Sequence, residues 1–353
     1  MAPKDVKFID DSIKTDNDDM TTEKIVYKPR IQWSNVAVNL FIHFGSLVGV
    51  YHMLTLQPKW QTYIWFLIVT VLCNLSVCIG VHRLWSHRSF KAVRKLRLLL
   101  LFFYTMAGQS SVYNWVKVHR VHHKFAETEK DPLNFRRGFF FAHVGWYCLT
   151  FHPECEKEMK RIDMKDIEAD KDIMFQYNNY EILFFIFNIM LPVLTPCYFW
   201  NESLWISFWV CFVTRFAINF TQLNFTNSAN HFIGRRPYDK GQSATDNLAM
   251  VFFSFGEGYH NYHHVFPYDY RSGEFGDIGH YNLSAVLIDF FAKFGWVYDR
   301  KMVSSEMISR RVMKSGDGTH FLSHEEAHKN AIYGYGDKDI DPDDQEDLDN
   351  MKN

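Results

Sequence analysis

Residues 60–87 read WQTYIWFLIVTVLCNLSVCIGVHRLWSH, and this stretch decides the fold class of the chain. Its first part, 60–81, is apolar and long enough to cross a bilayer as a helix, which takes roughly 20 residues. Trp60 and Trp65 stand where the aromatic residues of a membrane interface are expected. His82 and His87 follow directly after the apolar run. The stretch therefore predicts a membrane helix that leads into a histidine motif.

Three further apolar segments, at 33–54, 182–197 and 204–225, pair with 60–81 to make two helical hairpins. The hairpin links hold a single basic residue between them, whereas the region 82–180 is rich in Lys and Arg. The positive-inside rule then places this region and both termini in the cytosol. The prediction is an all-α integral membrane protein with four transmembrane helices and a cytosolic helical cap.

The chain divides into a polar segment 1–26, a membrane domain 27–314 and an acidic tail 315–353. Both ends are typical of disorder, and we expect the tail histidines to be solvated. The ends carry most of the excess acid, so the body is basic, which suits anionic headgroups or a phosphate-bearing substrate. The six cysteines show no CxxC spacing and are predicted to be free thiols.

The run 96–108 suits an interfacial or re-entrant helix, and Arg215, inside the fourth span, suits a structural role.

Nine of the 17 histidines fall in four motifs, each just beyond a predicted span or in the cap. They are His82 and His87; His119, His122 and His123; His231; and His260, His263 and His264. Asn227 lies one helical turn before His231. A lone histidine is more often an ordinary polar residue than a ligand. We expect that ordinary role for His43, His52, His143, His152 and His280.

Nine imidazoles exceed the four ligands of a structural zinc site and indicate two metal ions. Imidazole suits iron, zinc, copper and nickel, and spacing alone does not select among them, although a redox task favours iron. On an α-helix His82 and His87 would stand about 140° apart, so they are expected to reach different metals or to straddle the pair. Nearby acids that would orient imidazoles are Glu127, Glu129, Asp131 and Glu257.

The order HRLWSH, HRVHHKF, NSANH and GEGYHNYHH, with four spans in two hairpins, closely resembles the membrane acyl-CoA desaturases of animals. The resemblance runs from Tyr27 to His320 and is strongest to insect members of this stearoyl-CoA desaturase-like family. It implies that the nine histidines bind two iron ions, with Asn227 acting through a water. The centre would use O2 to remove two hydrogens from a fatty acyl-CoA chain, giving a delta-9 or delta-11 double bond.

The same resemblance implies an endoplasmic reticulum enzyme that takes electrons from NADH through cytochrome b5 and its reductase. The chain has no GxGxxG nucleotide motif and no His-Pro-Gly-Gly haem motif, so the electrons are expected to come from a partner. The products would be unsaturated fatty acids or pheromone precursors. The bilayer and the acyl-CoA are the other expected partners, and no nucleic acid is expected.

The positions that match the family's substrate contacts are partly unusual. In this family the acyl chain enters a narrow, kinked tunnel. Asn35 and Trp115 match residues that contact the substrate, and Thr70 and Asn74 stand at positions of the tunnel floor. Lys117 replaces an Arg that contacts CoA, and Leu223 and Asn224 replace a Thr-Trp pair at the kink of the tunnel. Asn74 suits equally a hydrogen bond across the helix bundle. All predicted metal ligands are present, whereas several predicted substrate contacts are altered. This combination predicts a working desaturase with a changed preference for acyl chain length, double-bond position or stereochemistry.

Two other classes of function stay open from the sequence. The same centre would serve a fatty acyl hydroxylase, an acetylenase or a conjugase, which differ by small shifts of substrate against metal. A histidine-rich metal transporter is a non-enzymatic alternative, but it calls for ligands near mid-membrane, and these motifs lie outside the apolar runs.

Overall fold

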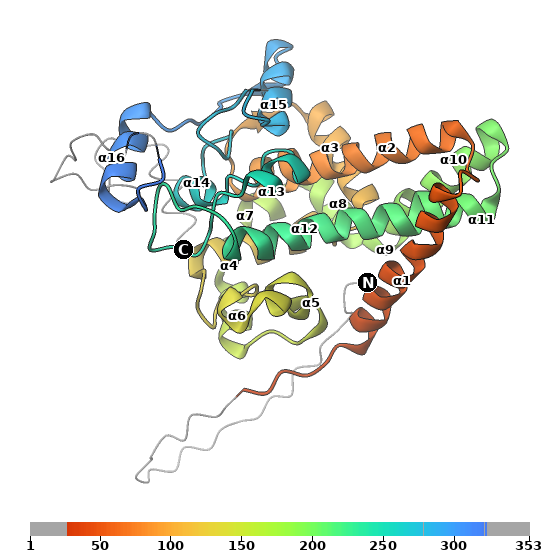
Figure 1. Cartoon of the computed structure of the whole chain (residues 1–353), viewed down its shortest axis with the longest axis horizontal. Coiled ribbons are helices and arrows are strands. Elements are labelled where there is room, and N and C mark those ends of the chain that lie inside the picture. Colours follow the sequence, from red (N-terminus) through yellow and green to blue (C-terminus); the bar gives the residue numbers. More distant parts are fainter. Residues whose placement is uncertain (1–26, 278, 321, 323–353) are drawn as a thin grey trace, which may run out of the picture.

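The computed structural model describes residues 27–277, 279–320 and 322. The disorder expected for segment 1–26 and for the acidic tail falls on residues 1–26 and 323–353, which lie outside the described residues. The described chain is mostly helical, with one two-stranded sheet (Figure 1). The predicted all-α membrane fold class is confirmed.

Within the described residues, four helices are long and apolar enough to cross a membrane. Their bounds, with the elements that compose them, are Trp33–Leu54 (α1); Trp60–Ser86 (α2 Trp60–Leu75 and the π-helical η1 Ser76–Ser86); Tyr180–Trp200 (α9 Tyr180–Phe184, π-helical η4 Phe185–Met190 and α10 Leu191–Trp200); and Leu204–Phe232 (α11 Leu204–Ser207, π-helical η5 Phe208–Thr214 and α12 Arg215–Phe232). The second and fourth helices continue past the predicted ends at 81 and 225, because the polar residues there are largely buried inside the protein.

The turns of the two hairpins touch each other. The backbone N–H of Lys59 donates to Oε2 of Glu202 at 2.8 Å, and the hydroxyl of Thr62 donates to the same oxygen at 2.5 Å. Both turns therefore lie at one end of the bundle, at the right of Figure 1, as a layout of two hairpins requires.

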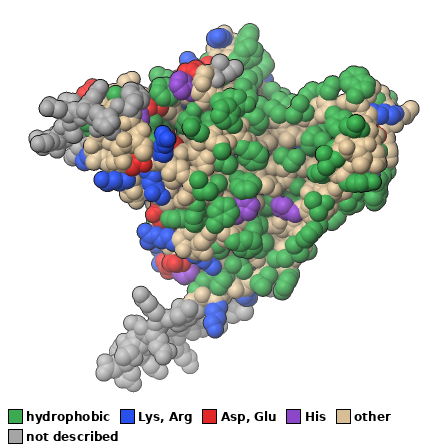
Figure 2. All heavy atoms as spheres, in the orientation of Figure 1, with side chains coloured by type: hydrophobic (Ala, Val, Ile, Leu, Met, Phe, Trp, Pro, Cys, Tyr) green, Lys and Arg blue, Asp and Glu red, His purple; other side chains and the backbone are tan. Residues whose placement is uncertain are grey.

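Most of the remaining elements gather at the opposite end of the bundle and form a cap, whereas α3 (Arg94–Ala107) lies alongside α2 and packs against η4 (Figure 1). The elements of the cap are β1 Lys91–Ala92, α4 Val112–Phe125, the 3-10 helix η2 Phe135–Arg137, the π-helical η3 Phe141–Gly145, α5 Trp146–Cys148, α6 Pro153–Arg161, α7 Lys165–Glu168, α8 Lys171–Asn178, α13 Leu248–Phe253, α14 His260–Val265, α15 Leu283–Lys293, β2 Val297–Tyr298 and α16 Ser305–Ser315. Figure 2 shows hydrophobic side chains spread over the bundle, whereas charged side chains gather mainly on the cap. This split is what a bilayer around the bundle requires.

Arg215 lies fully buried in α12 and joins three elements. Its guanidinium donates to the carbonyl oxygens of Cys211 at 2.9 Å, Met106 at 2.9 Å and Asn188 at 2.8 Å. These contacts tie α12 to the end of α3 and to η4. A guanidinium surrounded by backbone acceptors fits the structural role predicted for it.

The chain beyond α16 differs from the expectation of a solvated tail from residue 315. The N–H of Asp317 donates to the carbonyl of Arg236 at 3.1 Å. His320 is buried, with its Nε2 2.7 Å from Oε2 of Glu274. The expectation that His320 is solvated was wrong, because Glu274 and the ring of Tyr238 give it partners that are distant in sequence.

Candidate metal centre and substrate cavity

The nine histidines of the four motifs come together in two groups. One group holds His82, His87, His119, His123 and His263, and the other holds His122, His231, His260 and His264. Within each group the candidate ligand nitrogens all lie within 4.8 Å of one another. The two clusters HRVHH and HNYHH each contribute to both groups, because adjacent residues such as His263 and His264 point to different sides of a short helix.

The nitrogens face one another in a way that fits bound cations. Nε2 of His82 lies 2.9 Å from Nε2 of His263, and Nε2 of His87 lies 2.8 Å from Nε2 of His119. In the other group Nε2 of His260 lies 3.1 Å from the Nε2 atoms of both His231 and His264. Two imidazole nitrogens this close direct their lone pairs at each other, which is unfavourable unless a proton or a cation lies between them. One metal ion per group would accept all of these lone pairs together.

His82 and His87 lie in the same group, whereas the sequence left them either reaching different metals or straddling the pair. That expectation assumed α-helical geometry, but η1 is a π-helix, in which residues five apart are stacked by the hydrogen bond itself. The N–H of His87 donates to the carbonyl of His82 at 3.2 Å, and their ring centroids are 4.9 Å apart. The wider helix thus brings both imidazoles to one side.

Two of the four acids noted in the sequence contact histidines directly. Nδ1 of His82 lies 2.7 Å from Oε2 of Glu257, and Nδ1 of His122 lies 2.9 Å from Oδ1 of Asp131. An Nδ1–H held by a carboxylate leaves the Nε2 lone pair free for a metal. Glu127 does not contact a histidine but accepts a hydrogen bond from the backbone N–H of Ser243, whose hydroxyl lies beside His231.

Ser243 is a site residue that sequence reasoning missed. Its hydroxyl lies 2.9 Å from Nδ1 of His231 and takes the place that a carboxylate has beside His82 and His122. It lies twelve residues after His231 in a loop, and no motif marks it. Glu129 is exposed on the surface and does not take the orienting role expected of it.

Burial gives the site its electrostatics. Desolvation, followed by the nearby imidazoles, holds the pKa of six histidines outside the spans well below the usual range: His87, His119, His123, His260, His263 and His264. Neutral imidazole is the form that binds metals. Burial opposes ionisation of Glu257, but Arg83 and His82 outweigh it and lower its pKa to about 2.

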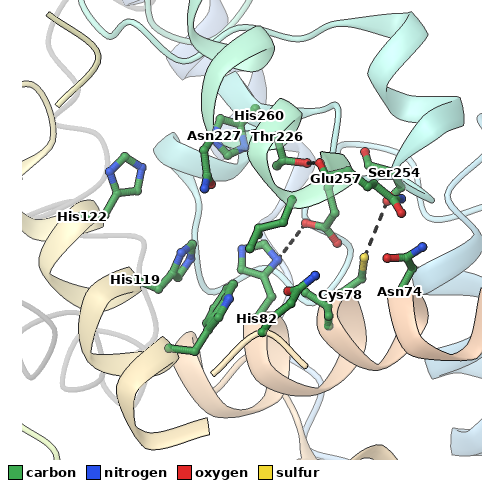
Figure 3. Close-up of a pocket in the computed structure, with 15 residues that line it drawn as sticks. Asn74, Cys78, His82, His119, His122, Thr226, Asn227, Ser254, Glu257 and His260 are labelled. Carbon is green, nitrogen blue, oxygen red and sulfur yellow. Dashed lines mark hydrogen bonds and ion pairs between the residues drawn. The ribbon is translucent and has the colours of Figure 1, made fainter. Parts of the chain in front are cut away.

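A cavity opens beside both groups (Figure 3). His82 and His119 line it from the first group, and His122 and His260 from the second. Asn227 also lines it and lies beside His260 in Figure 3. The cavity therefore brings a bound molecule against both groups and against the residue expected to act through water.

The structure separates the predicted substrate residues into two sets. Asn74, Trp115 and Leu223 line the cavity, and the ring of Trp115 stacks on His119 with centroids 4.7 Å apart. The residues that do not line it are Thr70, Asn35, Lys117 and Asn224.

Each of these four has a different surrounding. Thr70 donates to the carbonyl of Phe66 at 2.6 Å, and the amide of Asn35 donates to the carbonyl of Tyr147 at 2.8 Å. The ammonium of Lys117 lies 4.3 Å from the ring centroid of Tyr113. Asn224 is buried, with no partner for its side-chain amide among the described residues.

Asn74 combines the two roles considered for it. It lines the cavity, and its Nδ2 reaches Oδ1 of Asn219 across the bundle at a long 3.5 Å. Sequence reasoning missed Gln109 and Gln222 as cavity residues. Gln222 lies one turn before Thr226, which also lines the cavity, so the periodicity of α12 was the available signal.

Comparison with known proteins matches residues 58–301 to the model of the fatty acid desaturase family. An acyl-CoA Delta-9 desaturase of Acheta domesticus is 43% identical over 326 residues, covering 92% of this chain and 86% of the relative. An acyl-CoA Delta-12 desaturase of Tribolium castaneum is 39% identical, covering 89% and 90%. The stearoyl-CoA desaturase of Homo sapiens is 40% identical, covering 89% and 88%. The chain belongs to the fatty acid desaturase family.

Proposed function

We propose that this member of the fatty acid desaturase family inserts a delta-9 or delta-11 double bond into a fatty acyl-CoA chain. The observation that carries the proposal is one cavity lined by histidines of both groups and continued by apolar residues such as Val77 and Leu223. An alkyl chain in this cavity would lie against the predicted metal ligands. Relatives named as acyl-CoA desaturases support this substrate class.

The nine histidines would hold two iron ions, and Asn227 would assist through a water. When bound, the irons would supply the oxidation of the chain with O2 as co-substrate. The protein's own part is positional. Glu257 and Asp131 hold His82 and His122 in one tautomer, and Trp115 fixes the ring of His119 by stacking.

The cavity would hold the reacting methylene pair in place and exclude bulk water. Its lining comes from α2, η1, α4, α12, α14 and the loops after α3 and α13, so the reacting carbons would be fixed by rigid helices on several sides. Lys117 lies outside the cavity, where a half-buried ammonium suits the phosphates of CoA.

Electrons would come from NADH through cytochrome b5 and its reductase. The chain lacks a nucleotide fingerprint of the GxGxxG kind, which supports an external donor. We place the protein in the endoplasmic reticulum membrane with both termini in the cytosol. The basic region 82–180 and the position of the predicted ligands at the cap end of the spans support this orientation.

Expression in desaturase-deficient yeast tests the proposal. Wild-type protein is expected to give new unsaturated fatty acids, and gas chromatography–mass spectrometry of derivatised lipids locates the double bond. His122→Ala is expected to give none, while His152→Ala, outside both groups, is expected to act as wild type. Equal lipid profiles for wild type and His122→Ala, with both proteins present, would contradict the enzyme proposal.

The same chromatogram separates the related oxidations, because hydroxylated, acetylenic or conjugated products have different masses and fragments. Metal transport is disfavoured by where the histidines lie. His82 and His231 lie at the cap ends of their helices, whereas a transport path needs ligands near the middle of the membrane.

A further inference from the structure

Three side-chain amides line the cavity below the histidines. They belong to Asn74 in α2, Gln109 in the loop after α3, and Gln222 in α12. All three are buried, with exposed fractions of 5%, 7% and 6%. A cavity meant for a plain alkyl chain gains nothing from amides, since each buried polar group costs free energy unless it finds a partner.

The NH2 groups of the three amides are directed at the protein. Gln109 donates to the backbone carbonyl of Asn219 at 3.0 Å, and Gln222 donates to the backbone carbonyl of Phe253 at 2.5 Å. The NH2 of Asn74 faces Oδ1 of Asn219 at 3.5 Å. For the two glutamines the assignment of oxygen and nitrogen is fixed, because a backbone carbonyl accepts only from the nitrogen side.

The amide oxygens take no part in these contacts. Oε1 of Gln109 is fully buried and has no donor among the described residues. No donor from the described part of the chain reaches Oε1 of Gln222 or Oδ1 of Asn74 either. The residues that line the cavity thus carry hydrogen-bond acceptors that have no donor among the described residues.

These acceptors lie deeper in the bundle than the predicted ligands. Asn74 precedes His82 by eight residues on one continuous helix, which is roughly two helical turns. Gln222 precedes His231 by nine residues on the fourth span. A chain entering from the cap would meet the histidines first and the amides further towards its methyl end.

We propose that the cavity is built for an acyl chain that carries a hydroxyl group beyond the carbons that react. The inference rests on the proposed fatty acyl-CoA substrate and narrows its class. A hydroxyl donates to one of the amide oxygens, a contact that a methylene cannot make. A saturated chain would displace water from these oxygens and leave them unpaired, so the site discriminates against it.

Binding measurements test this without turnover. Purified wild-type protein is titrated with stearoyl-CoA and with a panel of hydroxystearoyl-CoA positional isomers. We expect one isomer to bind more tightly than stearoyl-CoA by roughly a factor of 3 to 10, the effect of about one hydrogen bond. The preference is expected to disappear in the one variant among Gln222→Met, Gln109→Met and Asn74→Leu that removes the oxygen to which the hydroxyl donates, since each substitution keeps the approximate side-chain size without the acceptor.

Gln61→Met is the matched control, since Gln61 lies in α2 but does not line the cavity. It is expected to keep the full preference. If a variant fails to fold, the wild-type panel and the remaining variants still decide. The proposal is overturned if no isomer binds better than stearoyl-CoA, or if the preference survives in every folded variant of the three.

The proposed function is tested separately, by desaturation of any acyl-CoA in the panel. If no chain gains a double bond while the hydroxyl preference persists, the proposed function fails and the binding inference stands. If stearoyl-CoA is desaturated and no isomer binds better than it, the inference fails and the proposed function stands.

Discussion

Nδ1 of His82 lies 2.7 Å from Oε2 of Glu257, and the other carboxylate oxygen accepts from Nη2 of Arg83 at 2.8 Å. Glu257 precedes the fourth histidine motif in sequence, yet it orients a histidine of the first. One buried carboxylate therefore links η1 to the loop before α14 and fixes the tautomer of a predicted ligand.

Replacing Glu257 is expected to weaken metal binding. Glu257→Gln keeps the shape but removes the charge that holds His82 Nδ1–H, so we expect metal affinity to fall about 10-fold to 100-fold. Competition with a graded series of chelators measures this. Glu129→Gln, on the surface, is the control and is expected to bind metal as wild type does. An unchanged affinity in Glu257→Gln would remove the orienting role.

The two histidine groups are expected to bind metal separately. The double variant His122→Ala/His264→Ala alters one group and should keep about half of the wild-type metal, with the other five ligands intact. The variant His122→Ala/His123→Ala alters both groups and should keep less. Metal analysis of purified protein by mass spectrometry compares them. The same loss in both variants would show that the groups do not bind independently.

The contact between Arg120 and Asp166 makes stability depend on acid pH. Asp166 accepts from Arg120 at 2.7 and 2.9 Å and from Arg88 at 2.9 Å. Burial opposes ionisation, but these arginines hold the pKa of Asp166 well below its ordinary value of 3.8. Folding therefore favours the ionised form of Asp166. Its carboxylate contributes its full stabilisation of the folded protein above pH 3.8, and this stabilisation is lost as the pH falls below 3.8 towards the lower pKa of the folded state.

We therefore expect Asp166→Asn to lower the melting temperature at neutral pH and to lose this difference on acidification. Melting curves of both proteins in detergent across the acid range measure the difference. Asp163→Asn is the control, because Arg120 contacts only the backbone carbonyl of Asp163. A difference that stays constant down to the most acid pH would contradict the assignment.

Arg215→Lys is expected to destabilise the bundle without changing the product. A lysine ammonium has no planar fork to reach the carbonyls of Cys211, Met106 and Asn188 together. The lost contacts should cost about 2 to 4 kcal/mol. Thermal unfolding in detergent gives the loss, and lipid analysis of yeast shows the product. A shift of the double bond at unchanged stability would instead indicate a role in the substrate channel.

The sequence by itself determined the fold class and the set of histidines. Membrane spans can be read from composition, because a bilayer demands long apolar helices whatever their neighbours are. The histidines were found because their spacing repeats and because each motif follows a span or lies in the cap. Local periodicity carries this information, so no tertiary contact was needed.

The tertiary structure decided how the histidines divide and what lies beside them. The π-helical turn of η1 placed His82 with His87, and no α-helical projection of the sequence gives that result. Ser243, Gln109 and Gln222 joined the site from loops and helices far apart in the chain. Asn224 is adjacent in sequence to Leu223, yet only Leu223 lines the cavity, because successive residues of α12 face different sides. Such side-chain neighbours follow from helix packing, which a single sequence does not encode locally.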